Sequence, residues 1–457
     1  MALGSARSNH TARVAVGGPR GLWCAWACWA GFAGSVWSAE ELRTPVTEAV
    51  VRHATGSPDG SAAFTFVPQD FAAPTNDLPV GVFDSGIGGL TVLEAILSLD
   101  AFDNRTLKPG ADGRPDFAGE RFVYLGDQAI MPYGNYPREG NEAYLKELIL
   151  KDAVFLLGRR FWPAADAPRP SLEKPPVKAI VIGCNTATAY GLAEIRAAIH
   201  AWGIPVFVVG VVEAGARGVL ESKRDLVARD EAIAVLATIG TCNSRAYPKA
   251  INATFGRAGR RVPEVVQRGF ADLAAAIEGD PAVTARTSVA QAIAADLRAM
   301  MDEYRASGGT RPVGSVVLGC THFPLVREQI LAELGRLRQA DVDGTRPFET
   351  LIAEDVDGID PAGLTARELF RTLALERLRA PDAADGAAAG PNLFFISVPR
   401  PHPGDDAAWA SARFARSPGK LDVEDTRVVP MTVDLLPEPS LNLIRSRLPT
   451  VWRSLGR

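Results

Sequence analysis

Two segments of this chain share one pattern, in which a short apolar run ends in Gly-Cys and a helical periodicity follows. Ala-Ile-Val-Ile-Gly-Cys-Asn-Thr-Ala occupies 179–187, and Ser-Val-Val-Leu-Gly-Cys-Thr-His-Phe occupies 315–323. Apolar residues then recur on one helical face in both cases, at Leu192, Ile195 and Ile199 and at Val326, Ile330 and Leu334. We therefore expect Cys184 and Cys320 each to lie where a strand gives way to a helix N-terminus, which stabilises a thiolate.

The same alternation of strand and helix patterns runs through the middle of the chain. Apolar runs predict strands at 79–83, 122–125, 180–182, 206–209, 233–236 and 316–318. Helical patterns lie between most of them, and this order is typical of an α/β fold with mostly parallel sheets. A strand with a polar end, at Asp84-Ser85 and again at 238–241, precedes each Gly-Cys unit at a comparable distance. This weak repeat predicts two pseudo-symmetric domains with the active site in the cleft between them.

The two ends of the chain differ from its middle. Residues 1–39 contain three arginines, no acidic residue and then an uncharged Trp- and Ala-rich stretch, which predicts a signal peptide for export to the periplasm. A cytoplasmic protein with an uncleaved N-terminus is the alternative, and stable membrane insertion is not expected. Residues 40–77 contain four prolines and predict an extension or linker with one short strand. Residues 401–457 predict an irregular tail that ends in a short docked helix.

Composition narrows the class of protein. Hydrophobic residues make up 47% of the chain and the formal net charge is −4, which predicts a large core and no nucleic-acid partner. Five cysteines at wide spacings do not form a disulfide framework. Cys24 and Cys28 lack a second pair of ligands for zinc, and we interpret Cys242 as an inert, small hydrophobic residue.

Polar residues gather at the predicted strand ends next to the two cysteines: Asp84, Ser85, Asn185, Thr186, Thr321 and His322. Hydroxyl and amide groups, together with helix N-terminal amides, suit the carboxylate and amino groups of an amino acid. Asp84 or His322 can take a thiol proton, which gives each sulfur a local base. With one sulfur on each face of a carbon acid, a proton can be removed from one side and returned on the other. That chemistry is racemisation without a cofactor.

Other uses of these residues explain less of the pattern. Nucleophilic hydrolysis by a Cys–His pair leaves the second Gly-Cys unit without a role. A metal site made of Cys184, Cys320, His322 and Asp84 has suitable residue types but no short ligand spacing, so no metal is predicted. The glycines at 86, 88 and 89 do not form the dinucleotide-binding fingerprint.

Taken in order, the motifs resemble the signatures of glutamate racemases. They are Val82-Phe-Asp-Ser-Gly-Ile-Gly-Gly-Leu-Thr91, Pro132-Tyr-Gly134, Gly183-Cys-Asn-Thr-Ala-Thr-Ala189 and Leu318-Gly-Cys-Thr-His-Phe-Pro-Leu325. Looser matches occur at 209–215, 241–247 and 359–362, and the resemblance covers roughly 78–374 with a further strand at 393–398. The Asp-Ser-Gly-x-Gly-Gly form favours the glutamate branch over the aspartate branch.

The resemblance implies a role for each matching residue. Cys184 and Cys320 would exchange protons with opposite faces of the α-carbon of glutamate, assisted by Asp84 and His322 respectively, with no cofactor. The substrate would be lined by Asp84, Ser85, Tyr133, Gly134, Asn185, Thr186, Thr321 and His322. The chain path would be interleaved, with domain 1 at 78–210 and 325–400 and domain 2 at 211–324. The resemblance is compatible with a homodimer. It also implies that D-glutamate would serve the peptidoglycan of the cell wall.

Several features depart from the family pattern. The loop at 238–243 has an unusual filling that includes Cys242, and 100–119 is an inserted loop. Export would separate the enzyme from a cytoplasmic pathway and expose its thiols to an oxidising compartment. Two alternatives therefore stay open: a related racemase for another amino acid, and an exported amino-acid-binding protein without turnover.

Overall fold

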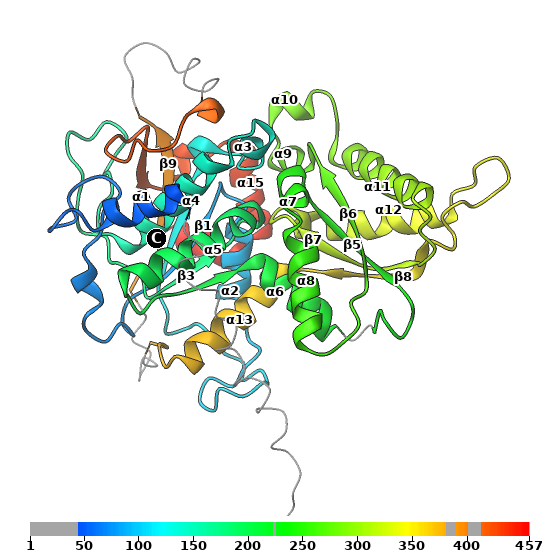
Figure 1. The fold of residues 1–457 in the computed structure, drawn as a ribbon, viewed down its shortest axis with the longest axis horizontal. Coiled ribbons are helices and arrows are strands. Elements are labelled where there is room, and N and C mark those ends of the chain that lie inside the picture. Colours follow the sequence, from blue (N-terminus) through cyan, green and yellow to red (C-terminus); the bar gives the residue numbers. More distant parts are fainter. Residues whose placement is uncertain (1–43, 223–224, 381–389, 401–412, 457) are drawn as a thin grey trace, which may run out of the picture. The chain divides into compact units, whose positions relative to one another are not determined.

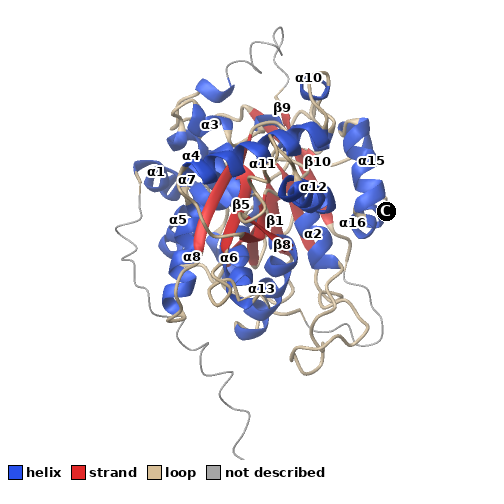
Figure 2. Cartoon of the chain, turned by 90° about the vertical axis from the view of Figure 1, so that its right-hand side faces the viewer, coloured by secondary structure: helices blue, strands red, loops and turns tan. Residues whose placement is uncertain are grey.

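In the computed structural model, the described part of the chain comprises residues 44–222, 225–380, 390–400 and 413–456. The predicted signal peptide at 1–39, with Cys24 and Cys28, lies outside these residues. Within them, no helix combines the length and the apolar character needed to cross a bilayer. Two mostly parallel sheets with helices around them confirm the predicted α/β class (Figures 1 and 2).

The first sheet has six strands in the order β10-β9-β2-β1-β3-β4. They are β1 (Val80–Asp84), β2 (Phe122–Gly126), β3 (Ala179–Ile182), β4 (Phe207–Gly210), β9 (Leu393–Pro399) and β10 (Thr426–Pro430). Neighbouring strands are parallel, except that β10 runs antiparallel to β9. Every residue of β1, β2 and β3 is buried, as expected for strands with both faces covered, which is why their apolar runs were recognisable.

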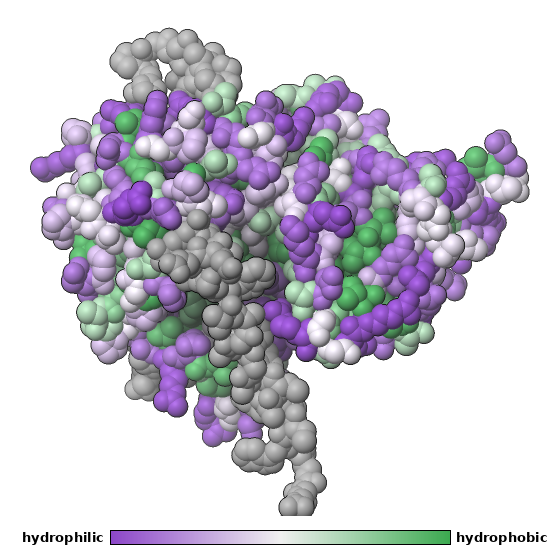
Figure 3. All heavy atoms as spheres, in the orientation of Figure 1, coloured by the Kyte–Doolittle hydropathy of each residue, from purple (hydrophilic) through white to green (hydrophobic). Residues whose placement is uncertain are grey.

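The second sheet has four parallel strands in the order β6-β5-β7-β8. They are β5 (Ala232–Thr238), β6 (Glu264–Phe270), β7 (Val313–Gly319) and β8 (Ile352–Ile359). The central strand β7 is fully buried, whereas the edge strands β6 and β8 are half-buried along most of their length. Figure 3 shows hydrophobic atoms between the helices on the viewed face of this sheet. The charged, partly exposed sequences of β6 and β8 explain why neither strand was predicted.

Helices follow nearly every strand of both sheets (Figure 1). Those of the first half are α1 (Pro45–Ala54), α2 (Leu90–Leu97), α3 (Asn135–Arg138), α4 (Glu142–Leu157), α5 (Asn185–Trp202), α6 (Val211–Glu221), α7 (Ile239–Ser244) and α8 (Ala246–Arg257). The rest are α9 (Leu273–Glu278), α10 (Pro281–Thr284), α11 (Val289–Ala306), α12 (Arg327–Gln339), α13 (Pro361–Leu375), α15 (Glu438–Arg447) and α16 (Pro449–Leu455). Single 3₁₀ turns are η2 (Pro68–Phe71), η3 (Gln128–Ile130), η4 (Phe323–Val326), η6 (Arg413–Ala415) and η7 (Val433–Leu435).

The chain enters the second sheet after α6 and returns to the first through α13, which packs against α2 and α6. The predicted boundary at residues 324 and 325 therefore needs correction. Residues 325–359 form η4, α12 and β8, and β8 pairs with β7 of the second sheet. The chain returns to the first sheet near residue 360. The prediction missed this boundary because β8 is a polar edge strand whose sequence carries little strand signal.

The segment at 40–77 is not the predicted linker with a short strand, because its described part begins with the helix α1. The Thr44 hydroxyl accepts a hydrogen bond from the Thr47 N–H, and Pro45 occupies the first helical turn, where a missing N–H costs nothing. Thr47, Val50 and Ala54 are buried, and α1 packs against α4 and α5. The extension is thus part of the core of the first sheet.

The predicted docked helix at the C-terminus is confirmed as α16. Val451 is buried and α16 packs against α2, where the Glu94 carboxylate accepts hydrogen bonds from the Thr450 and Val451 N–H groups at 2.9 and 2.8 Å. A carboxylate that accepts the first N–H groups of a helix stabilises that helix end. The tail also contains β10 and α15, which the sequence did not predict.

Candidate active site

Asp84 is the last residue of β1, and the loop that follows it contacts several other candidate site residues. Its buried carboxyl accepts hydrogen bonds at Oδ1 from the Ser85 backbone N–H at 2.6 Å and the Ser85 hydroxyl at 3.3 Å. The loop packs closely on Asp84 at Gly89, where a Cβ would lie 2.5 Å from the Asp84 Cβ. Burial raises the pKa of Asp84, and His322 and Cys184 counter that rise only in part. Asp84 therefore releases its proton closer to neutrality than an exposed aspartate does.

Cys184 follows β3 and is the N-cap of α5, as predicted. Its sulfur accepts a hydrogen bond from the Ala187 N–H at 3.4 Å, and its thiol donates to the Ser85 hydroxyl oxygen at 3.7 Å. Burial, followed by the nearby Asp84 carboxylate, nevertheless raises the pKa of Cys184. The expectation that the helix N-terminus would favour the thiolate is wrong here, because desolvation outweighs it. Cys184 carries a proton that it can give away.

Cys320 follows β7 directly, but the next element differs from the prediction. The turn η4 begins at Phe323 and α12 only at Arg327, so Cys320 is not at a helix N-terminus. Its partner is His322, whose Nδ1 lies 3.7 Å from the sulfur. The two thiols thus have different surroundings, a helix N-terminus in one case and an imidazole in the other.

His322 has a second partner that sequence reasoning missed. Its Nε2 lies 2.7 Å from Oε1 of Glu278, the last residue of α9, and both side chains are about nine-tenths buried. Burial alone would lower the pKa of His322, but Glu278 and Cys320 outweigh it and raise that pKa well above its usual value. Glu278 lies 42 residues before Cys320 at a helix end, and no motif or spacing in the sequence points to it.

The loop after β1 contacts both Gly-Cys units. The Thr321 hydroxyl donates to Asp84 Oδ2 at 3.5 Å, and the Thr91 hydroxyl donates to the Thr321 carbonyl at 3.0 Å. Gly88 permits this approach, because a Cβ there would collide with the Thr321 and His322 side chains. Five predicted site residues are therefore brought together around one loop: Asp84, Ser85, Cys184, Thr321 and His322.

Asn185 and Thr186 connect the start of α5 to the helices of the second sheet. The Thr186 hydroxyl lies 3.2 Å from the Thr238 hydroxyl and 3.1 Å from the Thr241 hydroxyl. The Tyr247 hydroxyl donates to Asn185 Oδ1 at 2.7 Å. The segment 238–243, predicted as a loop, is the end of β5 and the helix α7, which carry Thr238 and Thr241, and Tyr247 lies on α8. These bonds therefore connect polar groups of the two sheets.

The cavity beside Cys320 is small. A cavity of about 10 Å³ is lined by Asn185, Cys320, Thr321 and Asp360, among others, and this volume suits one water molecule. Cys184 and Cys320 are each only 6% exposed. An amino acid is larger than this cavity.

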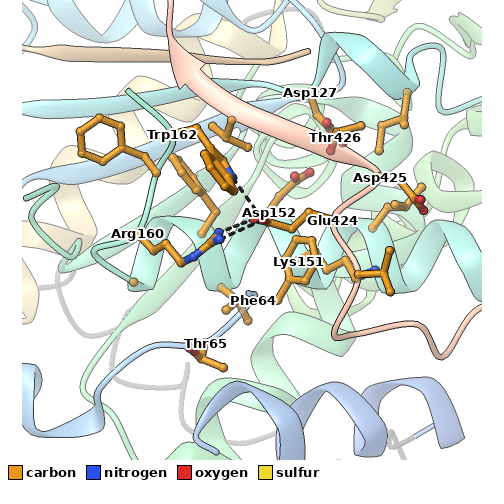
Figure 4. Close-up of a pocket in the computed structure, with 18 of the residues that line it drawn as sticks. Phe64, Thr65, Asp127, Lys151, Asp152, Arg160, Trp162, Glu424, Asp425 and Thr426 are labelled. Atoms are coloured by element: carbon orange, nitrogen blue, oxygen red, sulfur yellow. Dashed lines mark hydrogen bonds and ion pairs between the residues drawn. The ribbon is translucent and has the colours of Figure 1, made fainter. Parts of the chain in front are cut away.

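Tyr133 and Gly134 occupy the loop after η3. The buried Tyr133 hydroxyl lies 2.6 Å from Oδ2 of both Asp127 and Asp152. One hydroxyl proton serves only one of these contacts, so the other needs a proton on a carboxyl group. Asp127 and Asp152 line a separate cavity of about 60 Å³ (Figure 4), and burial raises the pKa of Asp127 to about 6 and that of Asp152 well above its usual value.

The position of Gly134 is set by the second sheet. It packs against Gly240 of α7, where a Cβ would lie 2.9 Å from the Gly134 Cα. The Tyr133 hydroxyl thus contacts the carboxyl pair, while Gly134 packs against α7, which follows Thr238 and carries Thr241. The contact of Tyr133 and Gly134 with substrate stays a prediction.

Cys242 differs from the two strand-end cysteines. It is half-buried against the apolar core, and burial raises its pKa to about 12, which fits an inert thiol. Across the described residues, no group of three or more His, Cys, Asp or Glu side chains is arranged to hold a metal ion.

Several known proteins are similar to this chain. The profile of the family described as Asp/Glu/Hydantoin racemase matches residues 162–346. The glutamate racemase of Pediococcus pentosaceus is 30% identical over 310 residues, which cover 67% of this chain and 87% of that protein. That of Enterococcus faecalis is 32% identical over 264 residues, or 57% and 73% of the two chains. The solved structure of glutamate racemase isoform RacE1 from Bacillus anthracis covers 70% of this chain and 88% of its own, at 25% identity and a TM-score of 0.47.

These sequence similarities identify the class of protein as an isomerase, namely an amino-acid racemase. The chain belongs to the glutamate racemase family.

Proposed function

We propose that this racemase interconverts L- and D-glutamate, with Cys184 and Cys320 as acid and base on opposite faces of the α-carbon and with no cofactor. The observation that carries the proposal is that each buried thiol has its own proton partner beside one shared loop. Asp84 lies next to Cys184, and the His322–Glu278 pair lies next to Cys320. The Asp-Ser-Gly-x-Gly-Gly form at 84–89 and the curated glutamate racemases among the relatives support glutamate as the substrate.

One proton is removed from the α-carbon and one is returned to it in this mechanism, so the substrate keeps its proton count. Cys320, as a thiolate beside the His322 imidazolium, removes the α-proton from one face and becomes a thiol. Cys184, which carries a proton because its pKa is raised, returns one to the other face and becomes a thiolate. Proton exchange with solvent, relayed by His322 at Cys320 and by Asp84 at Cys184, then resets both sulfurs. The opposite enantiomer reacts by the same steps in reverse.

The polar residues around the loop suit the remaining groups of glutamate. Ser85, Asn185, Thr186 and Thr321 provide hydroxyl and amide donors for carboxylates, and Asp84 provides an acceptor for the ammonium group. Tyr133 and Gly134 complete the predicted lining. Because Asp84 already accepts hydrogen bonds from Ser85 and Thr321, substrate atoms that bind there would replace existing contacts.

We also propose export to the periplasm through the segment 1–39. The arginines and the uncharged, small-residue stretch of this segment support the proposal. Expression of the full chain, followed by cell fractionation and N-terminal sequencing of the mature protein, tests it. Cleavage near residue 39 and periplasmic recovery are expected, whereas an intact chain in the cytoplasm would contradict export.

The catalytic proposal is tested by incubating the reduced enzyme with L- and D-glutamate in D₂O. We expect deuterium at the α-carbon and a common, optically inactive end point from both enantiomers. Exchange with a different amino acid in a substrate panel would replace glutamate with that substrate. Tight binding of an amino acid without any α-proton exchange would instead establish the alternative, a binding protein without turnover.

A further inference from the structure

Tyr247 of α8 contacts the neighbours of both cysteines. Its hydroxyl donates to Oδ1 of Asn185, the residue after Cys184, at 2.7 Å. Its ring packs against Gly319, the residue before Cys320, where a Cβ would lie 2.9 Å from the ring carbon Cε2. One fully buried side chain thus contacts a residue next to each of the two cysteines.

The ring of Tyr247 packs against glycines, and its hydroxyl makes a hydrogen bond. The ring lies in a space left by two glycines, because a Cβ at Gly215 would also lie 3.0 Å from the ring. A buried hydroxyl needs a hydrogen-bond partner, and Asn185 supplies it. Burial raises the pKa of Tyr247 well above its usual value, so the hydroxyl keeps its proton and acts as a donor.

An asparagine amide has one oxygen that accepts and one NH₂ group that donates, and a half-turn about its last bond exchanges them. With its oxygen held by Tyr247, Asn185 has its NH₂ group left for another partner. Asn185 lines the small cavity beside Cys320 and Thr321. A carboxylate only accepts hydrogen bonds, so it can use the NH₂ group and is repelled by the amide oxygen.

We propose that Tyr247 is a positioning residue that fixes the Asn185 amide so that its NH₂ group is presented to a carboxylate of the amino-acid substrate. The inference rests on the proposed function, because it assigns the orientation of one substrate-binding group in that same site. Tyr247 itself does not touch the substrate. It acts through Asn185, which its hydroxyl holds, while its ring packs against Gly319 next to Cys320.

The variant Tyr247→Phe keeps the ring and removes only the hydroxyl. We expect KM for the substrate to rise about tenfold, the size of the loss of one hydrogen bond to a charged group, while kcat stays within about twofold. The matched control is Tyr304→Phe, which removes a tyrosine hydroxyl that donates to the Arg311 carbonyl on the second sheet. The control should leave KM and kcat unchanged.

A double-mutant cycle with Asn185→Ala separates positioning from general loss of stability. If Tyr247 acts through Asn185, Tyr247→Phe raises KM in the parent enzyme and has no further effect in the Asn185→Ala background. A general packing defect would raise KM by the same factor in both backgrounds, and that result would overturn the proposal. An unchanged KM in Tyr247→Phe would overturn it as well.

Failure of this inference is distinguishable from failure of the proposed function. The parent enzyme is first assayed for α-proton exchange across a panel of amino acids, and KM is measured with the substrate that exchanges. No exchange by the parent enzyme with any amino acid would overturn the proposed function and this inference with it. Exchange by the parent enzyme with additive effects in the cycle overturns the role of Tyr247 alone.

Discussion

Glu278 Oε1 lies 2.7 Å from Nε2 of His322, and the other ring nitrogen of His322 lies 3.7 Å from the Cys320 sulfur. This arrangement is a carboxylate–imidazole–thiol series that comes from a helix end and a strand end far apart in the sequence. Because the carboxylate raises the pKa of His322 against the effect of burial, the imidazolium persists at neutral pH. The charge of Glu278 therefore sets the protonation state of the imidazole next to the Cys320 sulfur.

Replacing Glu278 by glutamine keeps an acceptor for His322 and removes the charge. The pKa of His322 then falls, since burial is no longer opposed, and the imidazolium is lost at lower pH. We expect the alkaline limb of the kcat/KM profile to move down by at least about one pH unit, with a loss of about tenfold at pH 8. Glu303→Gln, which makes the same change at an exposed position, is the control. An unshifted limb in Glu278→Gln would contradict this role.

The buried carboxyl pair around Tyr133 makes stability depend on pH. Burial raises the pKa of Asp127 to about 6 and that of Asp152 well above its usual value, against about 3.9 in the unfolded chain. The native state therefore holds more protons than the unfolded state above pH 4, and the free energy of unfolding falls as the pH rises.

The substitution Asp152→Asn removes one of these two ionisable groups and keeps a partner for Tyr133. At pH 8 the variant should be more stable than the parent by on the order of 1–3 kcal/mol, and the difference should vanish toward pH 4. Urea unfolding at pH 4.5, 6 and 8 measures it. A difference that is independent of pH, or one that grows toward acid, would be incompatible with a buried protonated pair.

The helix α1 is the clearest difference between the extension and the linker that its prolines suggested. Val50 is 1% exposed on the face that packs against α4 and α5, whereas Arg52 of the same helix is exposed. Val50→Asp should lower the free energy of unfolding by roughly 3 kcal/mol or more, because it buries an unpaired charge. Arg52→Asp should change it by less than about 0.5 kcal/mol. Equal effects in thermal unfolding would mean that α1 does not pack on the core.

Much of the site was predictable because the strand ends of a parallel sheet share one edge. Val80 of β1 pairs with Ala179 of β3, so Asp84 and Cys184 leave the sheet side by side, and their polar neighbours follow. Fully buried strands such as β1, β3 and β7 were visible as apolar runs for the same reason. The edge strands β6 and β8 carry charged residues and are only partly buried, so their sequences lack a clear strand pattern.

The residues that sequence reasoning missed lie away from strand ends. Glu278 ends a short helix, and the contact of Tyr247 with Asn185 depends on where α8 lies relative to the first turn of α5. The effect of burial on the pKa of the thiols could not be predicted from the sequence either, since desolvation depends on packing from many elements. Desolvation outweighs the expected effect of the helix N-terminus on the pKa of Cys184.

The central claim is that Cys184 and Cys320 serve opposite faces of one α-carbon. The most direct measurement is α-proton exchange in D₂O by Cys184→Ala and Cys320→Ala, each with L- and with D-glutamate. Both variants should lose racemisation by at least about 10³-fold, because each lacks the acid or base of one face. Each should still exchange the α-proton of one enantiomer without inversion, and the enantiomer should differ between the two variants. Exchange of the same enantiomer by both variants, or racemisation retained by either, would contradict the account.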